Sequence, residues 1–165
     1  MMIDALRRLL LLVLLCVAQA LVFNHIQFFH CATPLVYVYF AIIFPRAYPK
    51  WASLLWAFFM GLCVDVFSNT HGMASASMTL IAVLQPYLLE LFLPREADEN
   101  IKASQKALGA SNFALLASTL VVVYCLVFYT LEAFSFFNWQ HWLSCIIGTS
   151  LLTVAFVFTL ESVRR

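Results

Sequence analysis

The chain has 165 residues, of which 64% are hydrophobic and only 10% are charged. Soluble domains carry about 25% charged residues, so this chain lacks the polar side chains needed to cover a water-exposed surface. Its mean hydropathy of +0.95 and its long apolar runs instead predict a protein whose solvent is the lipid bilayer. A formal net charge of +1 gives no reason to expect a nucleic-acid partner.

The first apolar segment, residues 6–23, has two interpretations. Basic residues precede an apolar core that ends in Ala18-Gln19-Ala20, which is the pattern of a cleavable secretory signal. The apolar run nevertheless continues past Ala20 to Phe23. This continuation favours a retained first transmembrane helix.

The second segment, residues 28–44, contains Pro34. Proline is favoured at the first position of a helix, and Thr33 could cap such a start. A helix from Pro34 to Phe44 would be about 16 Å long at 1.5 Å per residue, which is too short to cross a hydrocarbon core of about 30 Å. Either the preceding residues also lie in the membrane, or the segment is kinked or broken.

The remaining apolar segments complete a prediction of six transmembrane helices in a single membrane domain, 1–165. They are residues 51–68, 72–93, 109–131 and 139–163. All nine Lys and Arg residues lie at the N-terminus, in the 45–50 and 94–106 connections, or at the C-terminus. Basic residues are enriched in cytoplasmic segments, and six spans with a cytoplasmic N-terminus put all nine there. The sequence therefore predicts an all-α integral membrane protein with both termini in the cytoplasm.

The third and fourth segments meet in the stretch GLCVDVFSNTHGMASAS, residues 61–77. Its Asp65 is a carboxylate near the end of a span, where an acid costs up to about 3 kcal/mol at mid-bilayer and less toward the interface. The structural interpretation is that Asp65 accepts hydrogen bonds from the following turn and from the unpaired N–H groups that begin the next helix. Gly61 lies one turn before Asp65, and Gly72 and Ala76 are four residues apart, so these small residues predict closely packed helices.

Catalysis would require a second acid, a nucleophile–base pair or a metal set close to Asp65. Glu90 is expected at the opposite face of the bilayer, with Arg95 as a candidate counter-ion, and His71 is expected to be solvated in its turn. The five cysteines are odd in number and contain no CxxC pair, which indicates buried free thiols rather than disulfides or a zinc site. The sequence thus predicts no enzyme, no cofactor and no metal.

The stretch GLCVDVFSNTHGMASASMTLIAVLQPYLL resembles the rod shape-determining protein MreD family. That family carries a G-L-x-x-D motif at the end of one span, then a short turn with glycine and a helix of small residues. Gly61, Leu62, Asp65 and Gly72 match this pattern, whereas His71 stands where many members have proline. The later LFLPRE and LEAFSF also resemble one branch of the family, and the length and expected span number agree along the whole chain.

The resemblance implies a non-catalytic subunit of the bacterial cell-elongation complex in the cytoplasmic membrane. Such proteins bind the single-span protein MreC and help to couple MreB filaments to the peptidoglycan synthases. The family is also similar in fold to the substrate-binding S components of energy-coupling-factor importers. This similarity supplies the alternative, a substrate-binding membrane subunit of a vitamin importer.

The two functions make different demands on the helices. A solute-binding subunit needs polar groups that converge in an outward pocket, and the expected outer segments are short and poor in charge. A protein that holds other helices needs faces of small residues, and this chain has them. We therefore expect the face of residues 72–79, or the groove beside it, to receive a partner's transmembrane helix.

Overall fold

The computed structural model describes residues 2–22, 25, 32–93, 105–134 and 136–164, and the regular elements among them are helices, with no β-strand. The elements are α1 (Met2–Leu21), α2 (Val38–Ile42), α3 (Lys50–Ser68), α4 (Met73–Phe92), α5 (Gln105–Leu108), α6 (Ala110–Ala133), the 3₁₀ helix η2 (Phe136–Asn138) and α7 (Trp139–Val163). The predicted all-α class is confirmed.

Four of these helices, α3, α4, α6 and α7, are long and apolar enough to cross a membrane. At 1.5 Å per residue they measure about 28 to 38 Å, which matches a hydrocarbon core of about 30 Å. The helix α1 is not among them, and it carries Asp4, Arg7 and Arg8 in its first two turns. The described residues thus have the helices of a multi-pass membrane protein, and the count of six spans stays a prediction.

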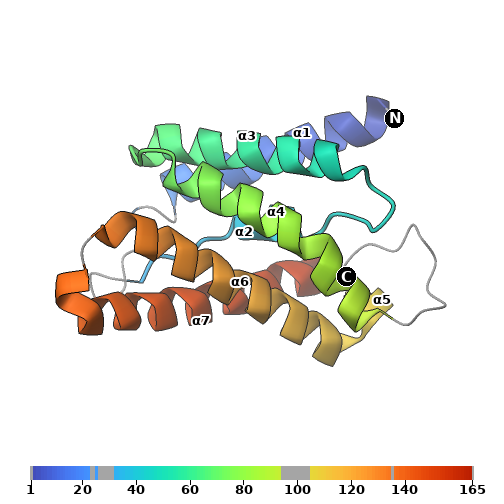
Figure 1. Cartoon of the computed structure of the whole chain (residues 1–165). Coiled ribbons are helices and arrows are strands. Elements are labelled where there is room, and N and C mark those ends of the chain that lie inside the picture. The colour runs from blue at the N-terminus through green and yellow to red at the C-terminus, as the bar shows by residue number, and fades with distance from the viewer. Residues whose placement is uncertain (1, 23–24, 26–31, 94–104, 135, 165) are drawn as a thin grey trace.

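The long helices pack in a series around α2 (Figure 1). Helix α1 packs on α3, α3 on α4, α4 on α6 and α6 on α7, while α2 contacts α1, α3, α4 and α6. All five residues of α2 are buried, and none exposes more than 4% of its surface. The second apolar segment is therefore the centre of the bundle and not one of its outer helices.

The second segment is broken within residues 32–44. Its helix begins at Val38 and ends at Ile42, and the N-cap residue Tyr37 does not cap it with a side-chain hydrogen bond. The interpretation in which Pro34 opens the helix under a Thr33 cap is therefore wrong. Five residues span only about 7.5 Å, so α2 cannot cross a membrane, and residues 28–31 lie outside the described part of the chain.

Side chains of neighbouring helices replace the missing helical hydrogen bonds at the start of this segment. The Gln19 amide donates to the Pro34 carbonyl at 3.1 Å and accepts from the Val36 N–H at 3.2 Å. The Leu35 N–H donates to Thr153 Oγ1 at 3.1 Å. A buried backbone group without a partner costs about 1–3 kcal/mol. These three bonds explain why residues 34–36 can leave the helical conformation inside an apolar bundle.

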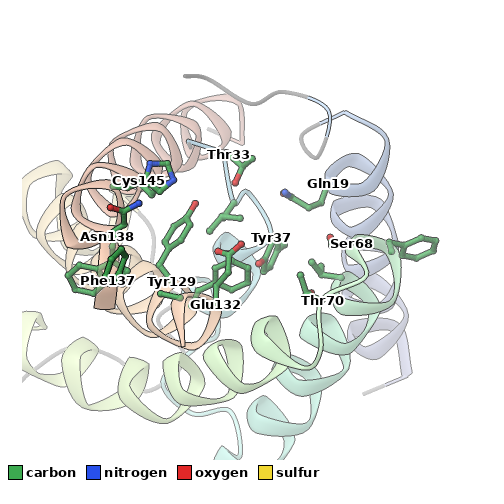
Figure 2. A pocket seen from close by; sticks show the side chains of 17 residues that line it. Gln19, Thr33, Tyr37, Ser68, Thr70, Tyr129, Glu132, Phe137, Asn138 and Cys145 are labelled. Atoms are coloured by element: carbon green, nitrogen blue, oxygen red, sulfur yellow. Dashed lines mark hydrogen bonds between the residues drawn. The ribbon is translucent and has the colours of Figure 1, made fainter. Parts of the chain in front are cut away.

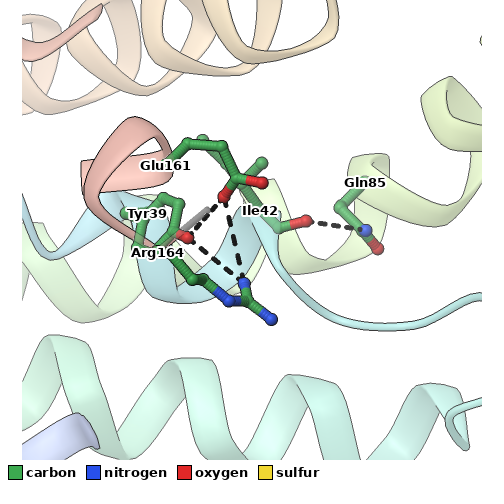
Figure 3. A network of polar contacts seen from close by, with 5 residues as sticks. All are labelled: Tyr39, Ile42, Gln85, Glu161 and Arg164. Carbon is green, nitrogen blue, oxygen red and sulfur yellow. Dashed lines mark hydrogen bonds and ion pairs between the residues drawn. The ribbon is translucent and has the colours of Figure 1, made fainter. Parts of the chain in front are cut away.

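The other end of α2 is held in the same way by α4. The Gln85 amide donates to the carbonyls of Ile42 and Phe44, at 3.2 and 3.0 Å, and Figure 3 shows the first of these bonds. The last carbonyls of a helix have no intrahelical donor. Gln85 supplies one for α2 from inside the bundle.

The C-terminal end of α7 is tied to α2 by a polar network (Figure 3). The Tyr39 hydroxyl donates to Glu161 Oε2 at 2.6 Å, and Arg164 Nη1 donates to the Tyr39 oxygen at 3.2 Å. Arg164 also lies 3.9 Å from the Glu161 carboxylate. The hydrogen bond to Tyr39 raises the pKa of the Arg164 guanidinium further above its usual range. The buried Glu161 carboxylate therefore has both a donor and a permanent countercharge.

Replacing Gln19 by Leu tests whether side-chain hydrogen bonds stabilise the broken segment. Gln19→Leu leaves the Pro34 carbonyl and the Val36 N–H unpaired, and we expect the thermal midpoint in detergent to fall by about 5 °C or more. The control is Gln140→Leu, because Gln140 is exposed at the start of α7, and its midpoint should equal that of the wild type. Equal midpoints for both variants would contradict this account.

Candidate functional site

Both carboxylate oxygens of Asp65, near the end of α3, accept hydrogen bonds from the start of α4 or from the turn before it. Its Oδ1 accepts from the Ala74 N–H at 3.0 Å and its Oδ2 from the Ser75 N–H at 2.9 Å. The Thr70 hydroxyl also donates to Oδ1. The first N–H groups of a helix have no intrahelical acceptor, and they favour a negative charge. The hydrogen bonds that the structural interpretation predicts for Asp65 are therefore present.

The turn between the two helices requires special backbone conformations. Asn69, the C-cap of α3, has φ 54°, and Gly72, the N-cap of α4, has φ 79°. Glycine adopts this left-handed region without strain, and asparagine tolerates it better than most residues. Because Gly72 has no side chain to cap α4, the carboxylate of Asp65 takes that role. His71 is exposed in this turn.

Gly61 allows the backbones of α3 and α4 to touch at the same place. A Cβ on Gly61 would meet the Ser75 Cα, and it would lie 2.7 Å from the Ser75 nitrogen and 2.8 Å from the Ala74 carbonyl carbon. Side chains cannot relieve such contacts, because backbone atoms make them. Gly61 and Asp65 therefore act together on one turn of α4.

The other residues of the predicted interaction motif lie on the surface. Leu62, Gly72 and Ala76 are exposed, whereas Ser75 is buried against α3. The face of residues 72–79 is thus divided between packing on α3 and an open side. Ala76 belongs to that open side, which continues along α4 through Leu80, Val83 and Tyr87.

The opposite end of the bundle carries the basic residues that the structure describes. The N-terminus, α5 and the C-terminus lie there (Figure 1). Arg46 Nε is 3.9 Å from the Glu90 carboxylate, while Arg95, the counter-ion that the sequence suggests, lies outside the described residues. The Arg8 guanidinium lies 3.9 Å from the centre of the Tyr48 ring, a cation–π contact. Glu90 and Glu161 at this end thus each have an arginine as a neighbour.

A pocket of about 820 Å³ opens at the end of the bundle that holds the Asp65 turn. Figure 2 shows it enclosed by side chains of α1, α3, α6 and α7, with the segment before α2 beneath. Thr33, Leu35 and Tyr37 line it from that broken segment. In membrane proteins, irregular backbone is tolerated where it is buried in protein or lines a cavity. Here one side of the broken segment is buried and the other lines the pocket.

Most polar groups of the pocket have internal partners. Gln19 bonds the broken backbone on both sides of its amide. Thr70 donates to Asp65, and the Tyr37 hydroxyl is paired with that of Tyr124. The Tyr129 hydroxyl lies 2.7 Å from Thr149 Oγ1. These bonds fix the shape of the pocket, since each of them joins two different segments.

Glu132, in the last turn of α6, differs from these groups. It is the only acid among the described residues that line the pocket, and its side chain points into the open space in Figure 2. Its carboxylate forms no hydrogen bond and no ion pair within the described part of the chain. His141, across the pocket mouth on α7, is its titratable neighbour. The pocket therefore presents one carboxylate that is not hydrogen-bonded within the described part of the chain and that has His141 as its electrostatic neighbour.

Other chemistry is sparse in the described residues. They contain no group of three or more His, Cys, Asp and Glu side chains that could hold a metal ion. Cys16, Cys63 and Cys125 are free thiols, and Cys31 lies outside the described residues. Asp65 and Glu132, the two acids at this end, have different roles, because only the first is hydrogen-bonded to backbone.

Sequence reasoning misses the pocket and the broken segment that lines it, although one signal for the broken segment exists. Gln19, Gln85 and Thr153 are polar residues inside long apolar segments, and polar residues in such positions indicate partners in the bundle interior. Their number and spacing predict a polar interior. They do not identify the backbone of residues 34–44 as that partner.

Comparison of the chain with protein-family models, with curated protein sequences and with solved structures finds no match.

Two substitutions at Asp65 test its role in the joint between α3 and α4. Asp65→Asn keeps one acceptor oxygen but turns an N–H donor toward a backbone N–H, while Asp65→Ala removes every acceptor. In a thermal-shift assay in detergent we expect the order wild type, Asn, Ala, with a loss of about 2–4 kcal/mol for Ala. Glu90→Gln, at an exposed acid of the other end, serves as the control and should match the wild type. Unchanged stability with lost function would instead indicate an interaction or ligand role for Asp65.

Proposed function

We propose that this chain is a non-catalytic membrane subunit of the bacterial cell-elongation complex, of the MreD type. The observation that carries the proposal is the way in which the residues of the G-L-x-x-D motif are arranged in the structure. Asp65 is consumed by backbone donors of α4, and Gly61 allows the two backbones to touch. A motif used in this way maintains a shape and has no group left for a reaction. This use supports a protein that holds others in place.

The proposed orientation places the basic end of the bundle in the cytoplasm of a bacterial cell. The connections 22–33, 69–72 and 134–138 contain no Lys or Arg, and basic residues are enriched on the cytoplasmic side. If α1 and the residues before α2 also cross, this orientation gives six spans in the inner membrane, with both termini on the cytoplasmic side. The pocket and the Asp65 turn then face the outside.

Accessibility labelling tests this orientation in intact cells. In a background with the native cysteines replaced by serine, Ala47→Cys and Asn138→Cys introduce thiols at exposed positions of the two ends. A membrane-impermeant maleimide should label Asn138→Cys and leave Ala47→Cys unlabelled until the cells are lysed. Labelling of Ala47→Cys in intact cells would overturn the orientation and the assembly role that depends on it.

The proposed partner is an MreC-like protein with a single transmembrane helix, and its proposed site is the open side of α4. This side combines the small Ala76 with the exposed Leu80 and Val83. In lipid, helices associate through close packing and hydrogen bonds rather than the hydrophobic effect. A small residue at the centre of an exposed face permits that close approach. Through such a partner, the chain would couple MreB-like filaments inside to peptidoglycan synthases outside.

Enlarging Ala76 tests this site without disturbing the interior. Because Ala76 is exposed in the isolated chain, Ala76→Leu should insert and fold normally but recover several-fold less MreC-like protein on co-purification from membranes. The matched control is Val122→Leu, an exposed position of α6, which should leave recovery unchanged. Undiminished association of Ala76→Leu would count against this face.

A substrate-binding subunit of an importer is the second candidate, and one observation favours it. The pocket is lined by a broken membrane segment, and in many transporters interrupted helices form the substrate site. Its volume of about 820 Å³ falls within the usual range of ligand pockets. Co-purification with an importer's energising module, in place of an MreC-like partner, would favour this candidate.

A further inference from the structure

We propose that the pocket between α1, α3, α6 and α7 binds a small organic cation with an apolar body, and that the Glu132 carboxylate is its counter-ion. This inference concerns the pocket alone and does not depend on the MreD-like role. If the chain is instead a substrate-binding subunit of an importer, this inference gives the chemical class of the substrate that the pocket binds.

The charge of the pocket selects against anions. Among the described residues that line it, none is Lys or Arg, and Glu132 is the only carboxylate. The basic residues of the described chain belong to the other end of the bundle (Figure 1). An anion would therefore meet the like charge of Glu132, with His141 as the only basic side chain among the described lining residues. A cation would gain a partner of opposite charge in the Glu132 carboxylate, whose residue remains exposed to solvent.

The hydrogen-bonding groups of the pocket select against neutral polar solutes. A sugar-like ligand needs several free donors and acceptors. Gln19, Thr70 and Tyr37 already bond to protein groups. Binding such a solute through them would break bonds that hold the broken segment and the Asp65 turn. Among the described lining residues, the carboxylate of Glu132 is the one carboxylate acceptor, and binding to it breaks none of these bonds.

Aromatic side chains supply the apolar part of the site. Phe67, Phe128, Tyr129 and Trp142 line the pocket from α3, α6 and α7. Phe128 is stacked on Tyr124 and meets Tyr129 edge to face, with ring centres 5.9 and 5.5 Å apart. Aromatic faces attract organic cations, most strongly when water is excluded. The lining thus fits an amine or amidinium carried on a flat or apolar body.

Three isosteric probes test the proposal by calorimetry. The full chain is placed in nanodiscs of zwitterionic phosphatidylcholine, so that lipid headgroups do not attract the cation. Benzamidine is the cation, benzamide its neutral isostere and benzoate the anion. We expect benzamidine to bind about tenfold or more tightly than benzamide, a factor worth about 1.4 kcal/mol, and benzoate to bind most weakly.

Variants connect the preference to Glu132. Glu132→Gln should remove the preference for benzamidine while benzamide still binds, which shows that the pocket is intact. Glu132→Asp should restore much of the preference, and Glu90→Gln, at the other end of the bundle, should leave it unchanged. Absence of benzamidine binding in the millimolar range, equal affinities for benzamidine and benzamide, or a preference that survives in Glu132→Gln would each overturn the proposal.

The calorimetric results for the wild type and for the Glu132 variants do not depend on whether the chain binds an MreC-like protein. A wild-type chain that binds the cation but no MreC-like protein would refute the assembly role and keep this inference. The converse result would refute the inference alone.

Discussion

The structure depends on one constraint: in an apolar bundle, every backbone group outside a regular helix needs a partner from within the protein. The segments before and after the short helix α2 break the helical pattern at the centre of the bundle, and the N–H groups of Leu35 and Val36 and the carbonyls of Pro34, Ile42 and Phe44 are bonded by side chains of other helices. Gln19, Gln85 and Thr153 bond to them from α1, α4 and α7. The surrounding helices are therefore held to α2 by polar bonds as well as by packing. This explains how a five-residue helix can be the core of the fold.

The same physical solution recurs at the joint between α3 and α4. There a carboxylate, rather than an amide, satisfies the first N–H groups of a helix whose own N-cap is a glycine. Gly61 makes the arrangement possible, because a side chain at that position would hold the two helices apart. An acid in an apolar segment is often evidence of chemistry. Here its bonds identify it as part of the architecture.

The two ends of the bundle consequently differ in what they can do. At the basic end, charges are paired or stacked: Arg46 with Glu90, Arg164 with Glu161, and Arg8 over Tyr48. At the other end, the break in the second segment opens a pocket, and the carboxylate of Glu132 is left without a bonded partner among the described residues. The proposed binding in the pocket and the proposed assembly through the open side of α4 would use different surfaces. One protein could carry both roles.

The sequence by itself determined the helical class, four apolar helices close to their expected limits, and the role of Asp65 as an acceptor for the next helix. These follow from local causes, namely hydrophobic run length and the unpaired donors at a helix start. Only the tertiary structure decided that residues 32–44 do not form one continuous helix, that Gln19 and Gln85 bond to the backbone of this segment, and that Glu132 faces a pocket. Those outcomes depend on contacts between residues far apart in the chain. A proline at position 34 is compatible with a helix start, and the choice against it came from Gln19 and Thr153, which stand 15 and 118 residues from their partners.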